Sequence, residues 1–179
     1  MTRALYLAEW IRGRFAHPLT HLKLQKLCFY CYGAALAFEC KGVGSIEFQA
    51  WKHGPVNLDV WNKYREFGSA PVAPPEFRHD GYENHTFGVL DCALKIYGRL
   101  TAWQIREESH LEGPWARAFA EQRAIAEDEL RAHFTQKFRG QSVALPANLV
   151  GSSSLSLDRI PVHRYPSFAD MAEAVSRIR

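Results

Sequence analysis

Cys28 and Cys31 stand three residues apart in the stretch KLCFYCYG, a spacing that can serve metal binding or thiol redox chemistry. The same spacing also puts two small apolar side chains on one face of a helix. A structural zinc site takes four ligands, commonly from two such pairs, whereas Cys40 and Cys92 each stand alone. A thioredoxin-like motif needs a βαβ context, which this stretch lacks. We therefore interpret the pair as core residues of a helix and expect no metal site.

Sequence signatures of hydrolytic and nucleotide chemistry are absent: there is no G-x-S-x-G elbow, no H-E-x-x-H pair and no P-loop. The segment EESHLEGPW offers carboxylates beside a histidine, at Glu107, Glu108, His110 and Glu112. Such groupings are common on helix surfaces, and acid–base catalysis requires a geometry that spacing alone does not supply. The enzymatic alternative is a metal-dependent hydrolase that uses histidines from the set His53, His79, His85 and His110. We expect a protein that is not an enzyme and that needs no cofactor.

Tryptophan is frequent, with five residues in 179. Buried tryptophans build cores, and exposed ones dominate the hot spots of protein interfaces, so both interpretations stay open. Trp51 in AWKHGPV and Trp115 in GPW each stand next to a Gly-Pro pair. A rigid turn fixes an aromatic ring at low entropic cost, which favours a binding role for at least part of the set.

Composition narrows the class of protein. Lys and Arg exceed Asp and Glu by 22 − 19 = 3, and the charges are interspersed, so no basic stripe indicates nucleic-acid binding. The longest apolar run, residues 27–38, is shorter than the roughly 18 residues of a membrane span. The first residues, MTRALYLAEWIRGRF, contain Glu9 and lack the apolar core of a signal peptide. We expect a cytoplasmic protein with reduced cysteines.

Hydrophobic periodicity predicts helices at 2–15 and from the N-cap Thr20 to about Phe38. In the second helix the apolar stripe predicts a buried face, with Lys23, Gln25 and Lys26 off it. The alternation in SIEFQAW predicts a short strand, which HGPV ends, and Pro55 is expected in the first turn of a third helix that stops near Gly68.

Further helices are predicted at residues 87–100, at TAWQIREESH, where Thr101 and Gln104 form a capping box, at PWARAFA and at 125–138. Residues 69–86 are predicted to be irregular or to contain a small second strand. The fold class is mainly α: a compact domain of about six helices, residues 1–139, with a short strand or β-hairpin insertion. Residues 140–179 are rich in Ser, Pro and Gly at first, which predicts an extended arm, and they end in a short amphipathic helix at 167–179.

Three segments in this order resemble the signature segments of one family: LTHLKLQKLCFYCYGAAL, AWKHGPVNLDVWNKYREFG and SHLEGPWARA. That family is the Panacea domain, the SocA-like antitoxin domain of bacterial and phage toxin–antitoxin systems. Its motifs fall on residues 22–32, 50–56 and 109–115, and the resemblance covers roughly 1–139. The chain departs from the usual pattern at CFYCYG and at His53.

The resemblance implies a mainly helical, non-enzymatic antitoxin that neutralises a cognate protein toxin by direct binding, or as an adaptor that delivers it to an AAA+ protease. The charge pattern and the short apolar runs favour neither nucleic acid nor a membrane as a partner of this chain, and a homo-oligomer stays open. The residues expected to form or support the toxin-binding surface are Trp51, His53, Gly54, Pro55, Trp61, Tyr64, Arg65, Ser109, His110, Pro114 and Trp115. Two alternatives remain: these motifs only hold the fold together, or the chain is an adaptor for a partner that is not a toxin.

Overall fold

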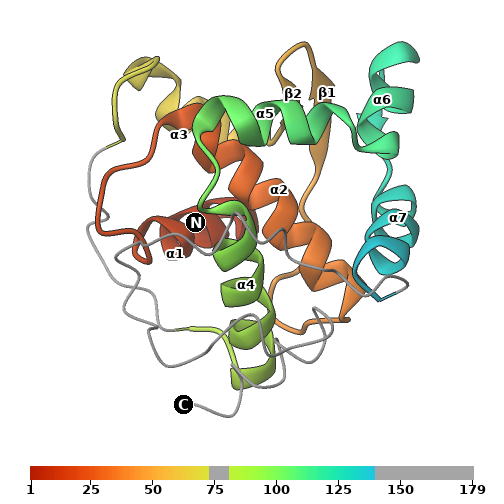
Figure 1. The fold of residues 1–179 in the computed structure, drawn as a ribbon, viewed down its shortest axis with the longest axis horizontal. Coiled ribbons are helices and arrows are strands. Elements are labelled where there is room, and N and C mark those ends of the chain that lie inside the picture. The colour runs from red at the N-terminus through yellow and green to blue at the C-terminus, as the bar shows by residue number, and fades with distance from the viewer. Residues whose placement is uncertain (73–80, 140–179) are drawn as a thin grey trace.

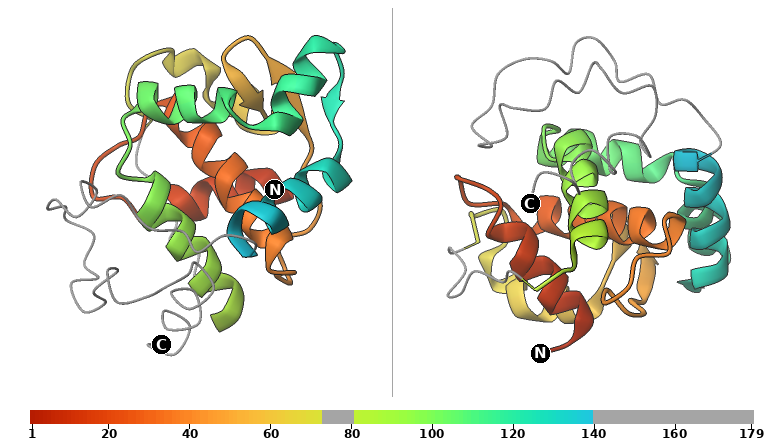
Figure 2. Two further views of the ribbon diagram at one scale, coloured as in Figure 1. Left: turned by 45° about the vertical axis from the view of Figure 1, so that its right-hand side comes forward. Right: turned by 90° about the horizontal axis from the view of Figure 1, so that it is seen from below.

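The computed structural model describes residues 1–72 and 81–139, and a single helix, α2 (His21–Ala37), passes through the centre of the domain (Figure 1). The view from below in Figure 2 shows that α1 and α7 lie on opposite sides of α2. The helices with the most extensive contacts to α2 are α1 (Arg3–Arg12), α4 (Asn84–Tyr97), α5 (Ala102–His110) and α7 (Glu127–Arg139). The prediction of a mainly α domain is confirmed, with seven α-helices among the described residues where about six were expected.

Helix α2 is buried on every side rather than along one stripe. It begins as predicted, since the hydroxyl of Thr20 accepts a hydrogen bond from the backbone N–H of Lys23 at 3.3 Å. Cys28 and Cys31 lie in the core, which confirms their interpretation. The prediction that Gln25 and Lys26 lie off the buried face is wrong: both are buried, because neighbouring elements also cover that side of the helix.

The strands form a small antiparallel sheet in the order β2-β1-β3, made of β1 (Phe48–Trp51), β2 (Gly54–Val56) and β3 (Ala124–Ile125). The expected β-hairpin insertion is therefore present, but Pro55 does not open the third helix. It lies in β2 opposite Ala50, and α3 (Leu58–Tyr64) begins later, after the N-cap Asn57. Side chains of α2 bind the backbone of Pro55 and Asn57, so these polar groups need no helical partners there.

The other helix ends follow local capping. Gly13 ends α1 three residues earlier than predicted, whereas α4 begins before the predicted residue 87 and ends at Tyr97 because Gly98 follows. The capping box of Thr101 and Gln104 is confirmed. The structure also has the 3₁₀ turn η1 (Arg65–Phe67) and α6 (Gly113–Ala120). The predicted arm and terminal helix, 140–179, lie outside the described residues.

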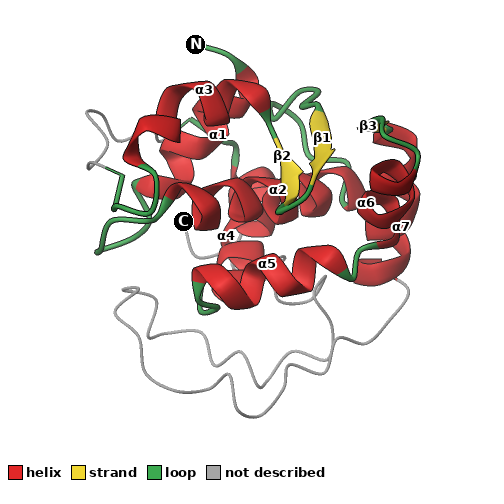
Figure 3. Ribbon diagram, turned by 90° about the horizontal axis from the view of Figure 1, so that it is seen from above, coloured by secondary structure: helices red, strands yellow, loops and turns green. Residues whose placement is uncertain are grey.

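Seen from above, the β-hairpin, α3, α5 and α6 lie together on one side of α2 (Figure 3). β2 contacts α5, and β1 contacts α6. These short elements carry the second and third signature segments, so the fold brings the two segments together above the first. Within residues 1–72 and 81–139, no helix has the length and apolarity to cross a bilayer.

A close approach between α2 and α7 requires glycine at position 33. A Cβ on Gly33 would lie 2.3 Å from the ring of Phe134, whose faces already pack against other aromatic rings. We expect Gly33→Ala to lower the free energy of unfolding by about 1–3 kcal/mol, since overpacking displaces the ring. Urea titration measures the change. Gly13→Ala, where the nearest atoms to the new Cβ are 3.6 Å away, is the matched control and should be neutral or stabilising.

The ammonium of Lys26 is fully buried and donates to the carbonyl oxygen of Pro55 at 2.8 Å. Burial, reinforced by the charge of Arg106, lowers the pKa of Lys26 to about 7. Between pH 7 and its ordinary value of 10.5, the unfolded chain binds one more proton than the folded chain. The stability therefore rises with pH in this window, with a slope of up to about 1.4 kcal/mol per pH unit.

We expect Lys26→Met to remove this rise. Urea unfolding of both proteins at several pH values from 6 to 9 gives the difference in unfolding free energy, which should grow in favour of the unaltered protein as the pH increases. Lys52→Met, on the exposed hairpin turn, controls for the loss of a lysine charge. A difference that stays constant from pH 6 to 9 would contradict the proposed state of Lys26.

Candidate functional site

The first signature segment holds the second through two buried polar side chains. The amide of Gln25 pairs with the backbone of Asn57 in both directions, accepting from its N–H and donating to its C=O at 3.0 Å each. One helical position further, Lys26 binds the carbonyl of Pro55. Buried backbone groups need such partners, and a lost partner leaves a desolvation penalty of about 1–3 kcal/mol. The path of the chain from the hairpin into α3 is thus fixed from the core.

The third segment packs on the same place. Gly54 adopts φ +94°, and a Cβ there would come within 2.5 Å of the hydroxyl of Ser109 and 2.8 Å of Lys26 Cε. Only glycine combines this backbone conformation with so close a contact. Ser109 is itself fully buried and donates to the carbonyl of Arg106. Gly54 and Ser109 therefore bring the end of α5 against the hairpin.

Trp115 joins α6 to the other side of the hairpin. Its indole Nε1 donates to the carbonyl oxygen of Trp51 at 3.2 Å. Its ring lies between two nearly parallel rings, His110 at 4.3 Å and Phe119 at 5.1 Å between centroids. This stack fixes the plane of His110 at the surface.

The buried carboxylate of Glu112 connects the α5–α6 junction to the core. It accepts hydrogen bonds from Tyr30 at 2.9 Å and from His133 and Lys137 on α7. Burial alone would raise the pKa of Glu112, but the hydrogen bond from His133 and the positive charge of Lys137 outweigh it, so the pKa is lowered. Glu112 therefore stays charged at neutral pH and fixes the start of α6, just before Trp115.

Aromatic side chains lie at the surface above this framework. We define the aromatic face as the exposed Trp51, Trp103 and Phe119 together with the half-buried Trp61 and His110. Trp51, 37% exposed, meets Trp61 edge to face at 5.3 Å. Trp103 is 63% exposed. Isolated exposed apolar residues are normal, but several large aromatics held on one rigid framework mark an interaction surface.

Two arginines flank the rings of the aromatic face. Arg65 lies over the ring of Trp61 at 4.8 Å, and Arg106 lies over the ring of Trp103 at 4.6 Å. Aromatic and arginine side chains together are the residue types enriched in interface hot spots. Sequence reasoning did not select Trp103 or Arg106. Their i, i+3 spacing on a helix whose buried residues are Ile105 and Ser109 is the signal that would have found them.

The predicted site residues divide into two groups. Those at the surface are Trp51, His53, Trp61, Arg65 and His110. Those buried beneath it are Gly54, Pro55, Tyr64, Ser109, Pro114 and Trp115. Tyr64 points away from the aromatic face, because its hydroxyl donates to Glu9 of α1 and accepts from Arg12.

The groups considered for catalysis do not form one site. Glu112 points into the core while Glu107 and Glu108 are exposed. His85 bonds the carbonyl of Phe38 at the end of α2, and His79 lies outside the described residues. Among the residues that the structure describes, no three His, Cys, Asp or Glu side chains converge as metal ligands.

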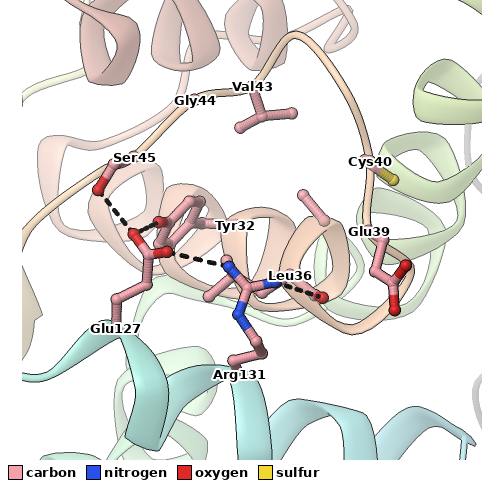
Figure 4. Close-up of a pocket in the computed structure, with 10 residues that line it drawn as sticks. Tyr32, Leu36, Glu39, Cys40, Val43, Gly44, Ser45, Glu127 and Arg131 are labelled. Atoms are coloured by element: carbon pink, nitrogen blue, oxygen red, sulfur yellow. Dashed lines mark hydrogen bonds and ion pairs between the residues drawn. The ribbon is translucent and has the colours of Figure 1, made fainter.

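A pocket of about 350 Å³ lies elsewhere, between the end of α2 and the start of α7 (Figure 4). Its polar groups bond one another: Glu127 accepts from Tyr32, Ser45 and Arg131. Burial raises the pKa of Cys40 to about 12, so its thiol stays protonated. The pocket thus offers neither a nucleophile nor a converging set of free polar groups.

Comparison with known proteins gives a consistent result. The chain is 28% identical over 118 residues to the antitoxin SocA of Caulobacter vibrioides, across 55% of this chain and 58% of that protein, so it spans little more than half of the relative's length. No solved structure matches the chain. The family model for the antitoxin SocA-like, Panacea domain matches residues 24–116, which include Gln25, Lys26, the hairpin, α5 and the first turn of α6. The chain belongs to the SocA-like Panacea domain family.

Proposed function

We propose that this protein is the antitoxin of a toxin–antitoxin system and that it neutralises its toxin by direct binding at the aromatic face. The observation that carries the proposal is the family match over residues 24–116, the segment that holds every member of this face except Phe119. The similarity to the antitoxin SocA supports the same class of function. Among the described residues, no group of His, Cys, Asp or Glu side chains is placed to hold the metal that the hydrolase alternative would use.

The construction of the face supports a binding role for its exposed members and a supporting role for the buried ones. Gln25, Lys26 and Glu112 hold the hairpin and α6 by hydrogen bonds from the core. A surface fixed before the partner arrives loses little conformational entropy on binding. Trp51 and Trp103 can therefore act as rigid anchors for pockets on the toxin.

The fate of the bound toxin is a second step of the proposal. An antitoxin can block its toxin while it stays bound, or it can act as an adaptor that passes the toxin to an AAA+ protease. Residues 140–179 are the part of the chain that could wrap the toxin or tether the protease, and they follow directly on α7.

Co-expression with the product of the adjacent gene tests the function. We expect growth rescue and co-purification of a complex. Trp103→Ala should weaken the complex by at least about 2 kcal/mol, because exposed tryptophans at an interface are frequent hot spots. The stability of the free protein should change by less than about 0.5 kcal/mol, as for surface substitutions. Calorimetric titration and growth assays give both values.

Phe67→Ala is the matched control, because Phe67 is an aromatic residue with 36% exposure whose ring packs on Tyr64, outside the aromatic face. Equal loss of binding in both variants would place the toxin elsewhere on the surface. If the unaltered chain neither rescues growth nor binds the product of the adjacent gene, the antitoxin function itself is contradicted.

Deleting residues 140–179 separates the two fates of the toxin. We expect the shortened chain to retain its melting temperature and to neutralise less well. Weaker binding would indicate that the segment wraps the toxin and orders on it. Unchanged binding with loss of toxin degradation, measured by pulse-chase, would indicate a protease tether. Unchanged neutralisation and unchanged toxin turnover would contradict both roles.

A further inference from the structure

Basic side chains gather where α5 meets the hairpin. Lys26 interacts electrostatically with Arg106, and His110 interacts with Arg106, Lys26 and His53. Their neighbour of opposite charge is Glu107, which pairs with Arg106. Burial, then the charges of Arg106, Lys26 and His53, lower the pKa of His110. Because the pKa values of Lys26 and His110 are lowered, the guanidinium of Arg106 is the positive charge that this cluster keeps at neutral pH.

The ion pair of Arg106 and Glu107 does little to compensate. The two residues are adjacent in α5, and neighbouring positions on a helix do not face each other. The side chain of Glu107 is 55% exposed, whereas that of Arg106 is 14% exposed, so solvent screens the pair from the side of Glu107. The carboxylate of Glu107 is therefore easily replaced by a better-placed acceptor.

Two buried nitrogens in this cluster have no hydrogen-bond partner among the described residues: Nε of Arg106 and Nε2 of His110. Buried polar groups are normally paired, and an unpaired one marks a place where a partner or an ordered water is expected. The guanidinium carbon of Arg106 lies 4.6 Å from the centre of the Trp103 ring. A guanidinium fixed in this way is arranged to receive a carboxylate through two parallel hydrogen bonds.

Resting on the proposed toxin-binding function, we infer that the aromatic face receives an acidic side chain of the toxin, an Asp or Glu flanked by apolar residues, whose carboxylate binds Arg106 beside His110. The apolar flanks pack on Trp103 and on the edge of the hairpin at Trp51. This pairing places a carboxylate against the guanidinium of Arg106, the charge that the cluster keeps at neutral pH. Arg106 is thus a specificity-determining residue for the partner rather than a residue that stabilises the fold.

Calorimetric titration with the toxin, the product of the adjacent gene, compares the unaltered protein with Arg106→Gln. We expect Arg106→Gln to weaken binding about 30-fold or more, as for a lost partner of a desolvated charge pair. The salt dependence of binding between 0.05 and 0.5 M NaCl should become shallower. The melting temperature of free Arg106→Gln should be unchanged or higher, because the substitution removes a charge that repels Lys26.

The variant Arg131→Gln is the matched control and should bind the toxin with full affinity. Arg131 pairs with Glu127 at the pocket between α2 and α7, outside the aromatic face. Arg106→Glu should abolish neutralisation. Selection for toxin variants that Arg106→Glu neutralises should return Asp or Glu changed to Lys or Arg at one position. Circular dichroism of each variant verifies its fold.

The outcomes separate the two proposals. Full affinity of Arg106→Gln, with tight binding by the unaltered protein, overturns the acidic-contact inference and leaves the antitoxin function intact. Absence of toxin binding by the unaltered protein overturns both. Binding of a 20-nucleotide single-stranded RNA that is lost in Arg106→Gln would assign the site to phosphate and also overturn the inference.

Discussion

The structure depends on the hydrogen bonds that two polar side chains of the central helix make with the backbone of the hairpin. Gln25 and Lys26 leave water completely to reach Asn57 and Pro55. A lysine in the core is unfavourable unless its charge is compensated or its proton is lost, and here burial moves its pKa to about 7. Such a residue is retained where it determines a conformation rather than where it adds stability.

Glu112 plays the corresponding part on the other side of the aromatic face. It binds Tyr30 of α2 and two side chains of α7, so the start of α6 is attached to both. Between these two attachments, Gly54 and Ser109 close the contact of hairpin and α5. Surface and core thus form one unit, in which exposed rings are positioned by buried polar groups.

Much of this architecture follows from the sequence. Capping by Thr20 and the capping box at Thr101 are local effects, and both were predicted correctly. The assignment of Cys28 and Cys31 to the core was also correct, because periodicity carries that information. The error at Pro55 has a physical cause: its strand pairing depends on Gln25 and Lys26, about thirty residues away along the chain.

The candidate site was predictable in part. Of the predicted site residues, Trp51 is exposed and His110 is half-buried, and their contact with a toxin stays a prediction. The burial of Gln25, Lys26 and Glu112 was not foreseen. A polar residue on a helix is assigned to solvent by default, since nothing local reports a distant acceptor. Trp103 and Arg106 were missed because only the assembled hairpin reveals that their side of α5 is a shared surface.

The burial of α2 on all sides also has a consequence for synthesis on the ribosome. One wall of its core is α7, and contacts such as Tyr32 with Glu127 join residues 95 positions apart. After α2 has emerged, roughly 100 further residues must be made, which takes about 5–20 s at ordinary elongation rates. During this interval α2 is incompletely covered, and transiently exposed apolar surface of this kind is what chaperones bind. The synthesis of α7 therefore sets the earliest moment at which α2 can be fully enclosed.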